Sequence, residues 1–150
     1  MRSMSFLRAT ATAAALAVGV SALGVAVAGP VEDRQADMKA IAQAMKDGAG
    51  LNSAGTFDAA KAKATMAKVA DAAKKAGTLF PKGSDADPKT AADAKVWSDS
   101  ADFNKRLTEL ATLATAAGNA PDVATYGPAF KAVGATCKSC HDVYRKKKPG

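Results

Sequence analysis

Apolar side chains recur at three- and four-residue spacing through most of the chain, and this periodicity predicts amphipathic helices. Turn-forming residues, mainly glycine and proline, divide the pattern into four stretches. We place the helices at about 31–47, 57–76, 100–117 and 121–147. A longer connection over 77–97 contains prolines and should lack regular structure. This order predicts an all-α protein, built as an antiparallel four-helix bundle.

Residue types at the ends of these stretches predict where the helices begin. Thr56 is the expected N-cap of the second helix, and Ser98 or Asp99 should cap the third. Gly127 and Pro128 fall inside the fourth stretch. A proline there should either kink the helix or mark its true start, because it lacks a backbone N–H.

Composition agrees with this fold class and limits the core. The chain of 150 residues is 48% hydrophobic but only 5% aromatic. Much of the hydrophobic fraction is alanine, which favours helices and builds weak strands. The core therefore lacks bulky side chains, and a bound group is expected to fill part of it. Trp97 and Phe103 are expected to pack in this core as ordinary aromatic residues.

The first 28 residues have the features of a secretory signal peptide. Arg2 and Arg8 precede or open a long uncharged apolar run, and small residues stand before Gly29. An uncleaved membrane anchor is the alternative, but the run is mostly alanine and only weakly hydrophobic. We therefore expect export to the periplasm, cleavage of residues 1–28, a mature domain of 29–150 and no membrane attachment afterwards.

The chemistry of the chain is concentrated in one short segment near its end. Cys137, Cys140 and His141 form the C-x-x-C-H pattern that attaches c-type haem. Residues three and four apart share a helix face, so two thiols can reach the haem vinyl groups while the imidazole reaches the iron. The chain has two cysteines and one histidine, and the motif uses them all. One haem c, covalently bound through two thioethers, is the predicted cofactor.

Other uses of this motif fit less well. A thioredoxin-like dithiol lies at a strand-to-helix turn, whereas this pair lies late in a helical stretch. A structural zinc site needs four ligands, and only three stand here. A plain disulfide would not need the histidine. A thiol redox enzyme without haem stays a remote alternative, and the absence of any other catalytic constellation or phosphate loop predicts that the protein is not an enzyme.

The net charge is +7, and basic residues gather near the end of the chain, at Arg145, Lys146, Lys147 and Lys148. A nucleic-acid surface is unexpected in an exported protein. Two interpretations remain open. One is a solvated helix end, where cations complement the helix dipole. The other is a docking surface for an acidic redox partner protein.

The chain resembles the class II cytochromes c over essentially all of 31–148. The segment 130–145 is similar to the closing helix of that family, which carries the C-x-x-C-H motif. Arg34, Gln35 and Met38 look like its first helix, and 96–99 followed by Phe103 looks like the entry to its third. The resemblance implies a four-helix bundle with one haem c, and a homodimer as a possible assembly through the first two helices.

The family has two branches, and the resemblance places Met38 over the iron in both. In the low-spin branch, of the cytochrome c-556 type, a methionine is the sixth ligand and the protein carries electrons. In cytochromes c′ the iron is five-coordinate and binds carbon monoxide or nitric oxide. The sequence around Met38 and Leu79-Phe80-Pro81 looks more like the low-spin branch. Met38 can equally be a packing residue, whereas Met45, two turns further along, is too far away to share the same iron.

The resemblance also implies roles for residues around the haem. Arg34, one turn before Met38, meets a haem propionate in the family, and a guanidinium suits a carboxylate well; a solvated arginine is the alternative. Gln35 is a second candidate for that contact. Tyr144 is expected near the proximal side of the haem, and Arg145 is expected to shield His141, although both could be ordinary interface residues. The predicted function is a periplasmic one-electron carrier, with a gas-binding cytochrome c′ as the alternative.

Overall fold

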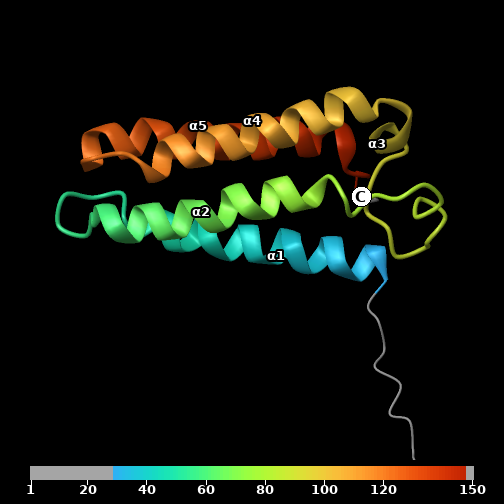
Figure 1. Ribbon diagram of the computed structural model, residues 1–150, viewed down its shortest axis with the longest axis horizontal. Helices are drawn as coiled ribbons and strands as arrows, with labels where there is room; N and C mark the ends of the chain where they lie inside the picture. The colour runs from blue at the N-terminus through green and yellow to red at the C-terminus, as the bar shows by residue number, and fades with distance from the viewer. Residues whose placement is uncertain (1–28, 148–150) are drawn as a thin grey trace, which may run out of the picture.

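The structure, a computed structural model, describes residues 29–147, which form five helices. These are α1 (Pro30–Ala49), α2 (Ala59–Ala76), α3 (Lys95–Ser98), α4 (Ser100–Gly118) and α5 (Val123–Tyr144). The four long helices lie side by side and alternate in direction, with the single turn of α3 at one end (Figure 1). Within 29–147 there is no strand, only one isolated bridge between Ala92 and Arg145. The predicted all-α four-helix bundle is confirmed. The proposed signal peptide, residues 1–28, lies outside the described residues.

The prediction of Thr56 as the N-cap of α2 was wrong. The helix begins at Ala59, and its cap is Asp58, whose carboxylate accepts the backbone N–H of Lys61 at 2.8 Å. Asp58 has the extended backbone that an N-cap requires, and its side chain satisfies one free N–H of the first turn. The hydroxyl of Thr56 instead bonds Ser53 within the preceding turn.

The last helix is shorter than predicted at both ends. Asp122 caps it by accepting the N–H of Thr125 at 2.8 Å, so α5 begins at Val123. Pro128 lies in the second turn and therefore does not mark the start. The helix stops after Tyr144 because Arg145 adopts extended backbone and pairs with Ala92. Asp99 precedes α4 as predicted, although its side chain makes no capping bond.

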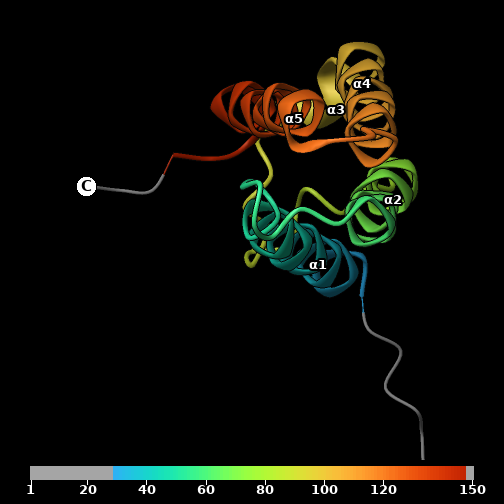
Figure 2. The same cartoon turned by 90° about the vertical axis from the view of Figure 1, so that its left-hand side faces the viewer.

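The helices do not pack equally on one another. α2 lies against both α1 and α4, and α5 lies against α4, whereas α1 and α5 share few contacts. Figure 2 looks along the helices and shows α1 and α5 as the separated pair. One side of the bundle is therefore held together by something other than direct helix packing.

Small side chains form much of the core, as the composition predicted. Fully buried alanines on α2 and α4 allow these helices to approach closely, with Met66, Val69 and Val133 filling the centre. A second cluster at the α3 end includes Phe103, with Trp97 packed against it. Phe103 is buried in this cluster as expected but also lines the cavity described below, whereas Trp97 is only half-buried.

Gly48 marks a point where α1 approaches α5 too closely for a side chain. A Cβ there would lie 2.7 Å from Phe130, 2.8 Å from the Tyr126 hydroxyl and 2.9 Å from Met66. That hydroxyl also donates to the Gly48 carbonyl at 2.9 Å. We expect Gly48→Ala to lower the free energy of unfolding by about 1–3 kcal/mol, the usual cost of overpacking. Denaturant unfolding measures it, and Gly55→Ala, whose Cβ would meet nothing within 4 Å, is the matched control.

Candidate haem site

A cavity of about 580 Å³ lies between α1 and α5, on the side of the bundle where these helices scarcely touch. Its volume falls in the usual range for small-molecule and cofactor sites. Side chains such as Ile41, Phe80, Val96, Leu107 and Leu110 make its lining largely apolar. The six side chains that the sequence suggested for a haem site all line this one cavity: Arg34, Gln35 and Met38 from α1, and Cys137, Cys140 and His141 from α5.

Cys137 and Cys140 lie half-buried in the last two turns of α5, where three-residue spacing places them on the cavity side. No disulfide joins them. Burial raises the pKa of each thiol. A dithiol redox site needs the opposite, a lowered pKa that supplies thiolate. Their surroundings therefore suit covalent attachment of a group in the cavity better than thiol redox chemistry.

His141 follows on the same turn and also lines the cavity. His141 stays exposed on one side, and its partial removal from water, followed by the charge of Arg145, lowers the pKa of the imidazole. The neutral form, which ligates metals, is therefore favoured at neutral pH. Arg145 also lines this cavity, and its charge acts on His141.

Met38 faces the cavity from α1 and is half-buried, packed against both core clusters. Because α1 and α5 are antiparallel, Met38 in the first half of α1 and His141 near the end of α5 lie toward the same end of the bundle. Met45 lines the cavity too. It lies seven residues beyond Met38, roughly 10 Å deeper along the helix.

Arg34 is buried, with 4% of its surface exposed, so the interpretation as a solvated arginine was wrong. Its Nη1 donates to the Leu79 carbonyl at 3.4 Å and to Ser84 Oγ at 3.0 Å. Its Nη2 donates to the Ser84 carbonyl at 3.1 Å and to Thr90 Oγ1. The guanidinium also lies over the Phe80 ring, 4.9 Å from its centroid. A buried cation at the cavity wall is thus surrounded by neutral acceptors.

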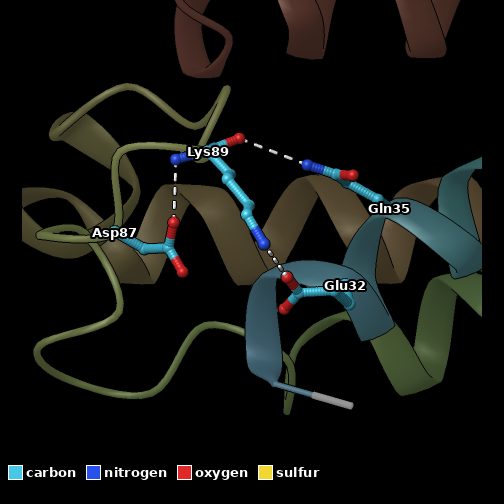
Figure 3. Close-up of polar contacts among 4 residues, drawn as sticks. All are labelled: Glu32, Gln35, Asp87 and Lys89. Atoms are coloured by element: carbon cyan, nitrogen blue, oxygen red, sulfur yellow. Dashed lines mark hydrogen bonds and ion pairs between the residues drawn. The ribbon is translucent and has the colours of Figure 1, made fainter.

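Gln35, the residue after Arg34, is exposed and contacts the same loop at Lys89, as Figure 3 shows. Gln35 Nε2 donates to the Lys89 carbonyl at 3.2 Å, and Lys89 Nζ pairs with Glu32 at 2.9 Å. Asp87 accepts the backbone N–H of Lys89 at 2.8 Å and shapes the turn. The hydrogen bond from Lys89 lowers the pKa of Glu32. These groups are exposed, so the ion pair contributes little to stability.

Tyr144 lines the cavity one turn after His141 and is 4% exposed. Its hydroxyl donates to Asp102 at 2.7 Å, and Arg106 Nε donates to the same carboxylate at 2.6 Å. The hydrogen bond from Arg106, then that from Tyr144, lowers the pKa of Asp102. Sequence reasoning placed Tyr144 near the haem but missed both partners, because no local pattern connects α4 and α5 at this point.

This hydroxyl gives a prediction for alkaline pH. Burial, reinforced by the bond to Asp102, raises the pKa of Tyr144 from 10.0 to about 12. Its contribution to stability is therefore complete below about pH 10 and is lost as the pH rises toward 12. We expect the advantage of the parent over Tyr144→Phe in thermal unfolding to shrink across this window. A constant difference from pH 9 to about 12 would contradict the shift.

Two further observations concern metal-binding clusters and membrane-spanning helices among the described residues. Within 29–147, no three or more His, Cys, Asp or Glu side chains are grouped so that they could hold a metal ion. No helix of the described part is long and apolar enough to cross a membrane.

Comparisons with known proteins agree with the site. The sequence model of the cytochrome c′ family matches residues 29–145. A cytochrome c′ of Rhodopseudomonas palustris is 39% identical over 140 residues, covering 92% of this chain and 96% of the relative. A cytochrome c-556 of Agrobacterium fabrum is 37% identical over 142 residues, covering 93% and 96%. The chain therefore belongs to the cytochrome c′ family of class II cytochromes c.

Solved structures extend this agreement to three dimensions. A cytochrome c′ from Rhodopseudomonas palustris has a TM-score of 0.73 at 36% identity and covers 82% of this chain and all of that one. Another cytochrome c′, described as having a ligand-controlled dimer dissociation, has a TM-score of 0.69 at 29% identity and covers 81% and 100%. Relatives of this chain thus include a dimeric form.

Proposed function

We propose that this protein is a periplasmic one-electron carrier and not an enzyme. One haem c occupies the cavity between α1 and α5, held through thioethers by Cys137 and Cys140, with His141 and Met38 as axial ligands. The observation that supports this most directly is the convergence of two thiols, an imidazole and a thioether on one apolar cavity. The haem iron, when bound, supplies the chemistry by cycling between its ferric and ferrous states.

The protein contributes geometry to electron transfer. His141 and Met38 line one cavity from two different helices, and two ligands kept in both oxidation states would keep the reorganisation on electron transfer small. A thioether ligand raises the reduction potential compared with a second nitrogen ligand. The largely apolar lining would give the bound group a less polar environment than water, which further influences the potential.

Arg34 and Gln35 are the proposed partners of the haem propionates. A buried charge without a counter-charge is costly, and the Arg34 guanidinium has only neutral acceptors at hydrogen-bond distance among the described residues. Asp87 and Glu32 attract the guanidinium from beyond hydrogen-bond distance, and a propionate at the cavity wall would add a negative charge in direct contact with it. Gln35 lines the same wall, and its amide is held by the Lys89 carbonyl.

The proposed export rests on the signal peptide, residues 1–28, and the proposed docking of a partner rests on the basic residues near the end of the chain. Covalent haem attachment takes place outside the cytoplasm, and residues 1–28 supply the export signal. Arg145, Lys146 and Lys147 are exposed beside the cavity end of α5, where an acidic redox partner would dock. A homodimer is the proposed assembly, in keeping with the dimeric relative. Cell fractionation should find the protein, shortened by 28 residues, in the periplasm.

A gas-binding role is the second candidate function. Met38 packs against both core clusters and would hold its place without a bond to iron, leaving the sixth position merely covered. Addition of carbon monoxide to the reduced protein separates the two functions. An electron carrier with Met38 bound should bind little gas, whereas ready binding would identify a cytochrome c′ with open iron.

A further inference from the structure

We infer that Thr90 is a positioning residue, the central link of a hydrogen-bonded brace that fixes the separation of the Met38 and His141 helices. The brace is the loop 79–93, which lies between α2 and α3 in the sequence. It is hydrogen-bonded to the start of α1 on one side and to the residues at the end of α5 on the other. The inference rests on the proposed placement of haem between these helices, and it assigns a role to Thr90, which no motif singled out.

The need for a brace follows from the packing. α1 and α5 form the two long walls of the cavity yet share few contacts. In a bundle, helix separation is normally set by side chains that interdigitate. Here the cavity takes their place at this end, so the spacing must be set by a different element.

One half of the brace fastens the loop to α1. The guanidinium of Arg34 spans the loop, reaching Leu79 and Ser84 at one point and Thr90 at another. It also lies against two neighbouring aromatic rings, with its carbon 4.9 Å from the Phe80 centroid and 5.8 Å from that of Trp97. Met38 lies one turn further along the same helix.

The other half fastens the loop to the end of α5. The N–H of Lys146 donates to the Ala91 carbonyl at 2.9 Å, and the N–H of Asp93 donates to the Tyr144 carbonyl at 2.9 Å. These bonds flank the bridge between Ala92 and Arg145. His141 lies one turn before Arg145, just as Met38 lies one turn after Arg34.

Thr90 belongs to both halves. It is 5% exposed, and its hydroxyl oxygen accepts from Arg34 Nη2 on one side and from the Ala92 N–H at 3.2 Å on the other. Its carbonyl accepts from Lys146 Nζ at 3.3 Å. A path of hydrogen bonds therefore runs from α1 through this one residue to α5. The exposed contacts of Lys89 lie outside this path and are weaker.

The experiment uses the haem-loaded protein and the variant Thr90→Val, which keeps the shape of the side chain but removes the hydroxyl. Thr90→Ser keeps a hydroxyl at this position and should therefore behave like the parent. Thr112→Val is the matched control, because it removes an exposed threonine hydroxyl that bonds only within α4. Two readouts are needed: hydrogen exchange at the Asp93 and Lys146 amides, and the rate of carbon monoxide binding to the reduced protein.

We expect Thr90→Val to speed exchange at both amides and to raise the carbon monoxide binding rate, each roughly tenfold, since it leaves buried donors unpaired. The high-spin fraction of the haem iron should also rise in Thr90→Val. Thr90→Ser and Thr112→Val should match the parent in all these measurements. Unchanged exchange, or faster exchange with an unchanged gas rate and spin state, would overturn the inference.

Failure of the proposed function gives a different pattern. A parent protein that is already high-spin and binds carbon monoxide readily would contradict ligation by Met38. The brace would then still have to show faster amide exchange and an altered gas rate in Thr90→Val, because the same two walls would still limit access to the iron. If Thr90→Val showed the same amide exchange and the same gas-binding rate as such a high-spin parent, the brace would be overturned as well.

Discussion

Replacing both motif cysteines, in Cys137→Ser with Cys140→Ser, is expected to abolish covalent haem attachment. The intact mass of the purified parent should exceed that of residues 29–150 by one haem, and the variant should lack this increment after denaturation. The physical reason is that each thiol supplies one thioether, and the chain has no other cysteine. The variant should also unfold more easily, because the apolar cavity between α1 and α5 is no longer reliably filled.

The neighbouring Ser139→Ala is the matched control for this pair. Ser139 lies between the cysteines but is exposed, and its hydroxyl bonds only the Thr136 carbonyl within α5. It should keep the full haem mass. Haem that survives denaturation in the double serine variant would show that attachment takes place elsewhere and would contradict the proposed site.

Met38→Ala is expected to open the iron of the haem-loaded protein. The ferrous variant should bind carbon monoxide with an affinity about a hundredfold higher, if the parent leaves about 1% of its iron open. The ferric variant should become high-spin and lose the charge-transfer band of a thioether bound to iron. Optical titration of the reduced protein with carbon monoxide measures the first effect, and the ferric spectrum measures the second.

Met45→Ala supplies the control for this experiment. Met45 also lines the cavity from α1 and is also half-buried, but it lies roughly 10 Å deeper than Met38. Its removal should cost some stability and leave the spectrum unchanged. A Met38→Ala spectrum identical to the parent's would show that Met38 only packs over the iron, and loss of the band in Met45→Ala would assign the ligand to Met45 instead.

The sequence predicted the parts of the site that depend on local spacing. Cys137, Cys140 and His141 share a helix face by their numbering alone, whereas Met38 was assigned to the site from the resemblance to class II cytochromes c. The structure brings these two sets to one cavity, as the resemblance implied. The roles of these residues toward a haem remain predictions that the variants above test.

The contacts of the long connection could not be predicted in this way. Thr90 meets Arg34 across 56 residues of sequence, and Tyr144 meets Asp102 across 42. Such pairs depend on how a loop folds back over the bundle, and neither a stripe nor a motif encodes that. The prolines correctly indicated an irregular segment, but α3 and the burial of Arg34 emerged only from the three-dimensional packing.

The helix ends show a similar division between local and distant causes. Two acidic residues, Asp58 and Asp122, were available caps that the periodicity did not single out from their neighbours. The early end of α5 has a distant cause, because Arg145 leaves the helix to pair with Ala92. Extending the helical pattern to Lys147 was reasonable from sequence, but a bridge to the loop replaces the last turn.

The measurement that tests the central proposal most directly is a pair of spectra of the haem-loaded mature protein, optical and electron spin resonance, in the ferric and ferrous states. We expect a low-spin iron in both states, with the thioether charge-transfer band in the ferric form. That result would support His141 and Met38 as axial ligands and the role of an electron carrier. A high-spin ferric signal without the band would contradict it, and the protein would then be a gas-binding cytochrome c′ with Met38 covering an open iron.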